Sequence, residues 1–103
     1  MRIQVWGSAY NWSVSDHRKV AIARLQELRD LLSDLPAEHE GAALVGSCDT
    51  LVRSIEAFHV EAIRFRMYGL ARQLTKLSDN LPGDTTRLIG EAREALAAAG
   101  FHT

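Results

Sequence analysis

The residue types that could carry chemistry gather around His59. Glu56 precedes His59 by three residues, and on one helix this spacing puts a carboxylate and an imidazole on the same side. Inward-facing E-x-x-H pairs of this kind hold iron in helical bundles, and Glu27, in an upstream helical segment, could supply a third ligand. On this interpretation Glu27, Glu56 and His59 are candidate metal ligands, and iron is the alternative to a protein without a cofactor.

The E-x-x-H spacing resembles that of the compact two-helix ferritin-like proteins of encapsulin compartments, and the resemblance covers about residues 17–65. It implies that two protomers complete a di-iron site at their interface. An ordinary surface role is the alternative for the carboxylate, because Arg53 lies three residues before Glu56 and can pair with it.

As a histidine expected in the middle of a helix and followed ten residues later by Gly69, His59 resembles the histidine phosphotransfer modules of bacterial signalling. The resemblance implies that an exposed His59 carries a phosphoryl group beside a cation. In that family a lysine follows the histidine by three residues and a small residue by four. Here those positions hold Ala62 and Ile63, so a nearby arginine would have to supply the cation.

The third interpretation of His59 needs no chemistry. Ile55 and Ile63 lie four residues on either side of it, which places it at the edge of an apolar stripe. A histidine there is expected to be partly buried with a satisfied hydrogen bond. The sequence leaves the metal, phosphoryl and packed interpretations open.

A run of positive charge follows His59. It contains no acid and four cationic side chains: Arg64, Arg66, Arg72 and Lys76. At helical spacing Arg64, Arg72 and Lys76 share a face and could contact phosphate groups or an acidic partner. The alternative is a solvated face that pairs with Glu61 and with acids of the first helix. No helix-turn-helix spacing accompanies the run, so nucleic acid is not an expected partner.

The composition favours a small protein of one domain. The chain has 103 residues, a net charge of −1 and one cysteine, Cys48, so an internal disulfide is excluded and a buried thiol is expected. Nucleotide-binding glycine motifs and common hydrolase signatures are absent. No apolar run has the length of a signal peptide or a membrane span, and a cytoplasmic location is therefore expected. Arginine outnumbers lysine, which is typical of a GC-rich bacterial genome.

Hydrophobic periodicity predicts an all-α fold, an antiparallel bundle of three to four helices. The expected helices cover about residues 14–35, 42–80 and 84–99. Apolar residues spaced seven apart, among them Phe58 and Phe65, form one seam in the second of these, and the seam continues through Leu70 and Leu74. A helix of that length would measure about 58 Å, so a break near Gly69 is expected. Gly100 is expected to end the last helix, with Phe101 packing back on it.

The first thirteen residues hold three aromatic side chains: Trp6, Tyr10 and Trp12. We expect this segment to be ordered and extended, and its aromatic side chains to bind a partner. The long apolar seam and this strand-like segment, which has no second strand to pair with, together predict a homodimer. The sequence thus favours a non-enzymatic interaction or regulatory module that binds itself and a further protein.

Overall fold

The computed structural model describes residues 14–36 and 40–101. The aromatic segment 1–13, with the predicted partner-binding residues Trp6, Tyr10 and Trp12, lies outside these ranges. Within them the chain forms four α-helices, one short 3₁₀ helix and no strand. The predicted all-α class is therefore confirmed for the described part of the chain.

α2 (Val14–Leu32) is the first described helix. Its fully buried face repeats at steps of four, three and four, which suits a period near 3.6: Ala21, Leu25, Leu28 and Leu32. The helix ends three residues before the predicted boundary. Leu35 donates its N–H to the Leu32 carbonyl at 3.1 Å, and the following Pro36 disfavours helical geometry at Leu35.

α3 (Gly41–Glu56) and α4 (Val60–Lys76) form a hairpin where the sequence predicts one broken helix over 42–80. α3 begins close to the end of α2. A Cβ on Gly41 would lie 3.0 Å from the Leu32 carbonyl oxygen, so glycine permits this approach. The predicted break near Gly69 is wrong, because α4 continues through Gly69 and the break falls at residues 57–59.

The turn at residues 57–59 ends α3 in a Schellman pattern of backbone hydrogen bonds. Phe58 donates its N–H to the Ile55 carbonyl, and His59 donates to the Ser54 carbonyl, each at 3.1 Å. This pattern requires a left-handed residue at its centre, and Phe58 has a φ of 58°. A residue in this conformation stops the helix, so α4 starts with a new direction and a new rotational setting.

α5 (Asp84–Ala98) follows the 3₁₀ helix η2 (Ser78–Asn80) and ends in the same pattern. Gly100 donates its N–H to the Ala97 carbonyl at 3.0 Å, and Phe101 donates to the Leu96 carbonyl at 2.8 Å. Gly100 has a φ of 95° and Phe101 is buried. The predicted glycine stop with Phe101 packed back on the helix is confirmed.

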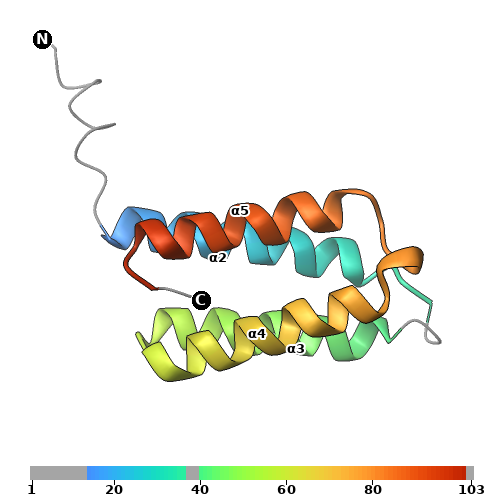
Figure 1. Cartoon of the computed structure of the whole chain (residues 1–103), viewed down its shortest axis with the longest axis horizontal. Coiled ribbons are helices and arrows are strands. Elements are labelled where there is room, and N and C mark those ends of the chain that lie inside the picture. Colours follow the sequence, from blue (N-terminus) through green and yellow to red (C-terminus); the bar gives the residue numbers. More distant parts are fainter. Residues whose placement is uncertain (1–13, 37–39, 102–103) are drawn as a thin grey trace, which may run out of the picture.

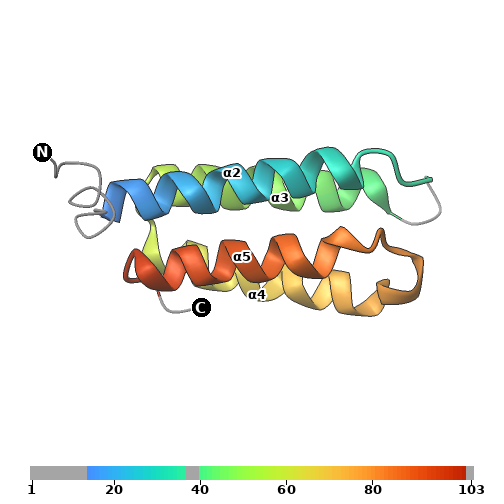
Figure 2. The same cartoon turned by 90° about the horizontal axis from the view of Figure 1, so that it is seen from above.

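The helices form two layers, with α2 and α5 in one and α3 and α4 in the other (Figure 1). Seen at right angles, α2 lies over α3 and α5 lies over α4 (Figure 2). Helices that follow one another in the chain run in opposite directions (Figure 1). α2 packs closely on α3 and α5, and α3 packs closely on α4. The corner between α4 and α5 is the least tightly packed of the four.

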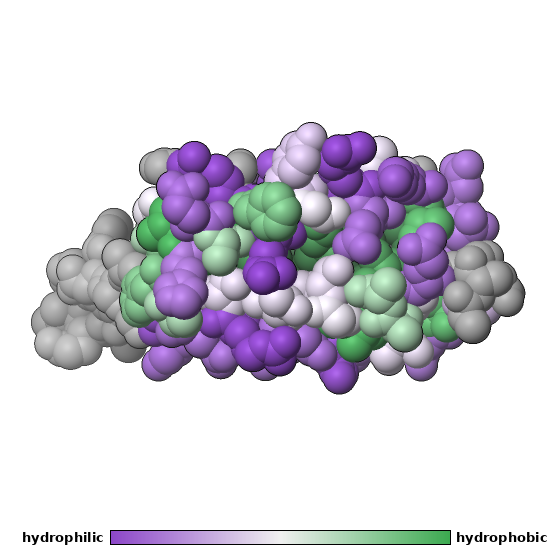
Figure 3. All heavy atoms as spheres, turned by 90° about the horizontal axis from the view of Figure 1, so that it is seen from below, coloured by the Kyte–Doolittle hydropathy of each residue, from purple (hydrophilic) through white to green (hydrophobic). Residues whose placement is uncertain are grey.

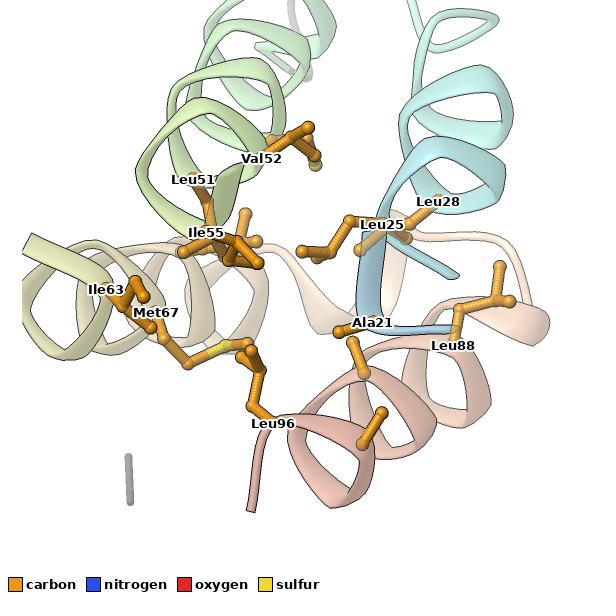
Figure 4. Close-up of a cluster of buried hydrophobic side chains, with 14 of the residues drawn as sticks. Ala21, Leu25, Leu28, Leu51, Val52, Ile55, Ile63, Met67, Leu88 and Leu96 are labelled. Atoms are coloured by element: carbon orange, nitrogen blue, oxygen red, sulfur yellow. The ribbon is translucent and has the colours of Figure 1, made fainter. Parts of the chain in front are cut away.

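The core lies along the axis of the bundle, and all four helices contribute buried side chains to it (Figure 4). Cys48 is fully buried, as predicted. The buried face of α4 consists of Ile63, Met67, Leu70 and Leu74. The predicted seam is therefore wrong at Phe58 and Phe65, which are 50% and 74% exposed, because the left-handed Phe58 interrupts the period that the seam assumed.

No helix among the described residues combines the length and the apolar character that crossing a membrane requires.

Candidate functional site

His59 lies in the turn between α3 and α4. It is the N-cap of α4, its carbonyl accepts a hydrogen bond from the Ile63 N–H at 2.8 Å, and its side chain is exposed. The prediction of a partly buried histidine in a helix is therefore wrong. The phosphotransfer resemblance loses its structural premise as well, because that resemblance assumed a histidine in the middle of a helix.

The predicted metal ligands come from different elements. Glu56 is the last residue of α3, so it does not share a helix face with His59. Glu27 belongs to α2 and forms an ion pair with Arg24. Across residues 14–36 and 40–101, no cluster of three or more histidine, cysteine, aspartate or glutamate side chains is arranged to hold a metal ion. The one-helix geometry from which the iron site was predicted is thus wrong.

The four cations of the predicted run are all exposed on α4. Arg64, Arg72 and Lys76 line one hollow of the surface, of about 790 Å³. Arg66 points elsewhere, since it lines a smaller hollow with Ser47 of α3. The structure therefore divides the predicted anion-contact residues into a group of three and an isolated fourth.

None of these four cations forms an ion pair with any described residue, although other charged groups of the bundle are paired. Arg29 of α2 pairs with Asp49 of α3 at 2.7 Å, and this hydrogen bond, followed by the charge of Asp49, raises the pKa of Arg29. Arg24 of α2 pairs with Glu91 of α5 at 3.1 Å. The expected pairing of the α4 cations with Glu61 and with acids of α2 is therefore wrong.

The hollow is the larger of two that together form a groove between α4 and α5. A second hollow, of about 360 Å³, shares Ala71, Thr75 and Arg93 with the first and continues it toward Leu81 and Ile89. We call the two together the α4–α5 groove. α4 supplies most of the first hollow and α5 supplies Arg93: Glu61, Arg64, Phe65, Met67, Tyr68, Ala71, Arg72, Thr75, Lys76 and Arg93.

Two aromatic side chains stand on the α4 wall of the groove. Phe65 is 74% exposed and Tyr68 is 62% exposed, and their spacing of three places them on neighbouring positions of one helix face. The guanidinium carbon of Arg72 lies 5.7 Å from the centre of the Tyr68 ring, within reach of a cation–π contact. Seen from the α3–α4 layer, apolar surface lies among hydrophilic side chains (Figure 3).

The groove exists because α4 packs closely on α3 and α5 packs closely on α2, whereas α4 and α5 pack less closely on each other. Each residue of a helix advances by about 100°, so Phe65, Tyr68 and Arg72 lie well away from the buried stripe that includes Met67. The apolar periodicity does not predict this exposed aromatic pair, because it places Phe65 in the buried seam. The available signal was an aromatic pair at helical spacing, interleaved with the cations of the run.

A separate aromatic cluster lies beside the start of α4 and does not line the groove. The guanidinium carbon of Arg18, on α2, lies 3.8 Å from the centre of the Phe58 ring. The Phe58 and Phe101 ring centres are 6.0 Å apart. These contacts join α2, the α3–α4 turn and the end of α5, so we interpret the cluster as structural.

Comparison of the chain with protein-family models, with curated proteins and with solved structures returned no match.

Proposed function

We propose that the protein is a non-enzymatic interaction module and that the α4–α5 groove is its partner-binding surface. The observation that carries this proposal is the exposure of Phe65 and Tyr68 on a groove wall whose neighbouring cations, Arg64, Arg72 and Lys76, have no ion-pair partner among the described residues.

Aromatic and arginine side chains are the residue types that contribute most to binding at protein interfaces. A ring that is largely exposed in the free protein can bury a large apolar area in a complex, with few side-chain torsions to immobilise. The adjacent cations keep the surface hydrated in the free protein and offer charged contacts to a partner. The groove combines both kinds of group, which supports an interaction role.

The experiment compares what the immobilised protein retains from an extract of its source cells, measured by quantitative mass spectrometry. The test variant is Phe65→Ser with Tyr68→Ser, which removes both rings from exposed positions. The matched control is Val60→Ser, because Val60 is exposed on the same helix but does not line the groove. The proposal predicts a protein retained by the wild type and the control and lost from the double variant.

If the double variant retains the same proteins as the wild type, the groove is not the binding surface. Circular dichroism of each variant, with thermal unfolding, shows that the fold is intact before the comparison is made.

The predicted homodimer remains part of the proposal, and one of the two arguments for it still applies. The apolar seam that suggested a second copy is folded back within one chain at residues 57–59, so it no longer calls for a partner helix. The remaining argument depends on segment 1–13. Light scattering after size exclusion, at tens of micromolar protein, tests it directly: a mass of twice 11.4 kDa is expected, and a mass of 11.4 kDa would contradict it.

A further inference from the structure

We propose that the occupant of the α4–α5 groove is an acidic amphipathic helix of a partner protein, which lies along α4 as an additional helix of the bundle. This inference rests on the proposed function and adds the chemistry and shape of the partner.

The length of the groove favours a helix over a compact ligand. Residues that line the first hollow extend along α4 from Glu61 to Lys76, a span of about 22 Å at 1.5 Å per residue. The second hollow continues in the same direction to Leu81 and Pro82. A partner helix of about 15 residues has the same length, whereas a small ligand would occupy only a fraction of it.

The apolar surface of the groove suits the apolar stripe of an amphipathic helix. Phe65 and Tyr68 form one wall, and the partly buried Ala71 lines both hollows of the groove. Met67 of α4 also lines the first hollow, and its buried side chain points toward that of Leu96 of α5 (Figure 4). Helices that bind in grooves place apolar side chains at steps of three and four residues, which matches the spacing of the ridge they would meet.

The charges around the groove select an acidic partner. Four cationic side chains and one carboxylate line the first hollow: Arg64, Arg72, Lys76, Arg93 and Glu61. Carboxylates flanking the apolar stripe of a bound helix would face these cations, and complementary charge increases both the rate of association and its specificity. Two copies of α4 facing each other would instead bring like charges together, so the partner segment is not a second α4.

The test uses three synthetic peptides of 18 residues, each labelled for fluorescence anisotropy. The first has leucines at helical spacing, with glutamates in the flanking positions. The second keeps the leucines and replaces every glutamate with lysine. The third has the composition of the first in an order that destroys the amphipathic pattern. We expect the first peptide to bind at least tenfold more tightly than the other two.

Protein variants locate the binding. Arg64→Glu with Arg72→Glu reverses two charges in the groove, and Arg53→Glu with Arg66→Glu reverses two exposed charges outside it, so the change in net charge is the same. We expect the groove variant to weaken binding of the first peptide at least tenfold and the control variant to weaken it less than threefold. Circular dichroism checks that both variants fold.

The inference is overturned if the scrambled acidic peptide binds as tightly as the first, because attraction would then be diffuse charge alone. It is also overturned if the two charge-reversal variants weaken binding equally, or if the first peptide does not bind. Should the peptide fail while the extract experiment still shows a protein whose retention requires Phe65 and Tyr68, the groove binds a partner of different chemistry. Failure of both experiments removes the proposed function as well.

Discussion

At the residue scale, Phe58 and Gly100 occupy the same position in the same helix-ending pattern and meet its demand differently. Gly100 takes a φ of 95° without a side chain to strain. Phe58 takes a φ of 58°, which costs about 1–2 kcal/mol for a residue with a Cβ. Its ring recovers part of this through Arg18, 3.8 Å from the ring centre, and through Phe101. Phe58 therefore departs from the usual preference for glycine at this position, and its tertiary contacts offset part of the conformational cost.

Cys48 provides a test of the core at the scale of one residue. Burial raises the pKa of its thiol from an ordinary 9.0 to about 12, and the charge of Asp49 adds to the effect. Because only the thiolate reacts, we expect Cys48 in the folded protein to resist a thiol reagent at pH 8.5. It should react rapidly in denaturant. The measurement is the rate of labelling by iodoacetamide, followed by mass spectrometry.

An Ala43→Cys variant supplies the control, because Ala43 is exposed on the same helix and its introduced thiol should label quickly without denaturant. Rapid labelling of Cys48 in the native protein would contradict its burial. The same shift sets a pH dependence: the folded state favours the neutral thiol, so this contribution to stability is complete below pH 9.0 and is lost as the pH rises toward about 12.

At the scale of the element, the sequence predicts the buried faces of most helices but not the rotation of α4 about its own axis. The period of the 14–35 segment and of residues 84–99 predicts their buried faces, because each helix is uninterrupted. The seam over 42–80 predicts the buried face of α3, and on α4 it predicts Leu70 and Leu74 but not Ile63 and Met67. Phe58 carries no sequence signal for a left-handed turn, since glycine or asparagine is the usual residue there.

The candidate site is likewise predicted only in part by the sequence. The spacing of Arg64, Arg72 and Lys76 was sufficient to predict that they share a face. The wall formed by Phe65 and Tyr68 was not predictable from the same pattern, because its exposure depends on where the preceding turn falls. The pairing of α4 with α3, and of α5 with α2, is a tertiary choice that a single sequence does not encode in its local periods.

Because Met67 is buried and Phe65 is exposed on α4, truncating these two residues should have very different effects on the free energy of unfolding. Met67→Ala should lower the free energy of unfolding by about 2–4 kcal/mol, because Met67 is buried and its removal leaves a cavity. Phe65→Ala should change it by less than about 0.5 kcal/mol, since the ring is exposed. Urea unfolding followed by circular dichroism measures both. A large decrease in the free energy of unfolding of Phe65→Ala would instead support the seam predicted from the sequence, in which Phe65 is buried.

Two glycines of the α5 segment predict changes of opposite sign. Gly90→Ala should stabilise the protein by about 1 kcal/mol, because Gly90 lies within the helix and an added Cβ would have no neighbour within 4 Å. Gly100→Ala should destabilise it by about 1 kcal/mol, because its positive φ strains any residue with a Cβ. Thermal unfolding of the two variants beside the wild type measures the difference. Stabilisation by both would show that α5 ends elsewhere.

At the scale of the whole molecule, the helices are not equivalent. α2 packs closely on both α3 and α5, whereas α4 packs closely on α3 alone, and the ion pairs of Arg24 and Arg29 tie α2 to both of its neighbours. The described part of the bundle is therefore built around α2. The helix that carries most of the proposed binding surface is held on one side only.

This asymmetry predicts where the bundle opens first. Hydrogen exchange of backbone amides reports local opening, and we expect protection in the middle of α2, around Leu25, to exceed protection in the middle of α4, around Leu70, by about tenfold or more. Native-state exchange followed by NMR gives both values under one condition. Equal protection in the two helices would show that the bundle opens only as one cooperative unit.

The turn at residues 57–59 makes the character of the groove depend on the length of the chain. Deleting or inserting one residue there would rotate α4 by about 100° about its own axis. Such a change would turn Ile63 and Met67 out of the core and carry charged side chains toward α3. The length of this turn therefore determines which side of α4 faces the interior and which side lines the groove.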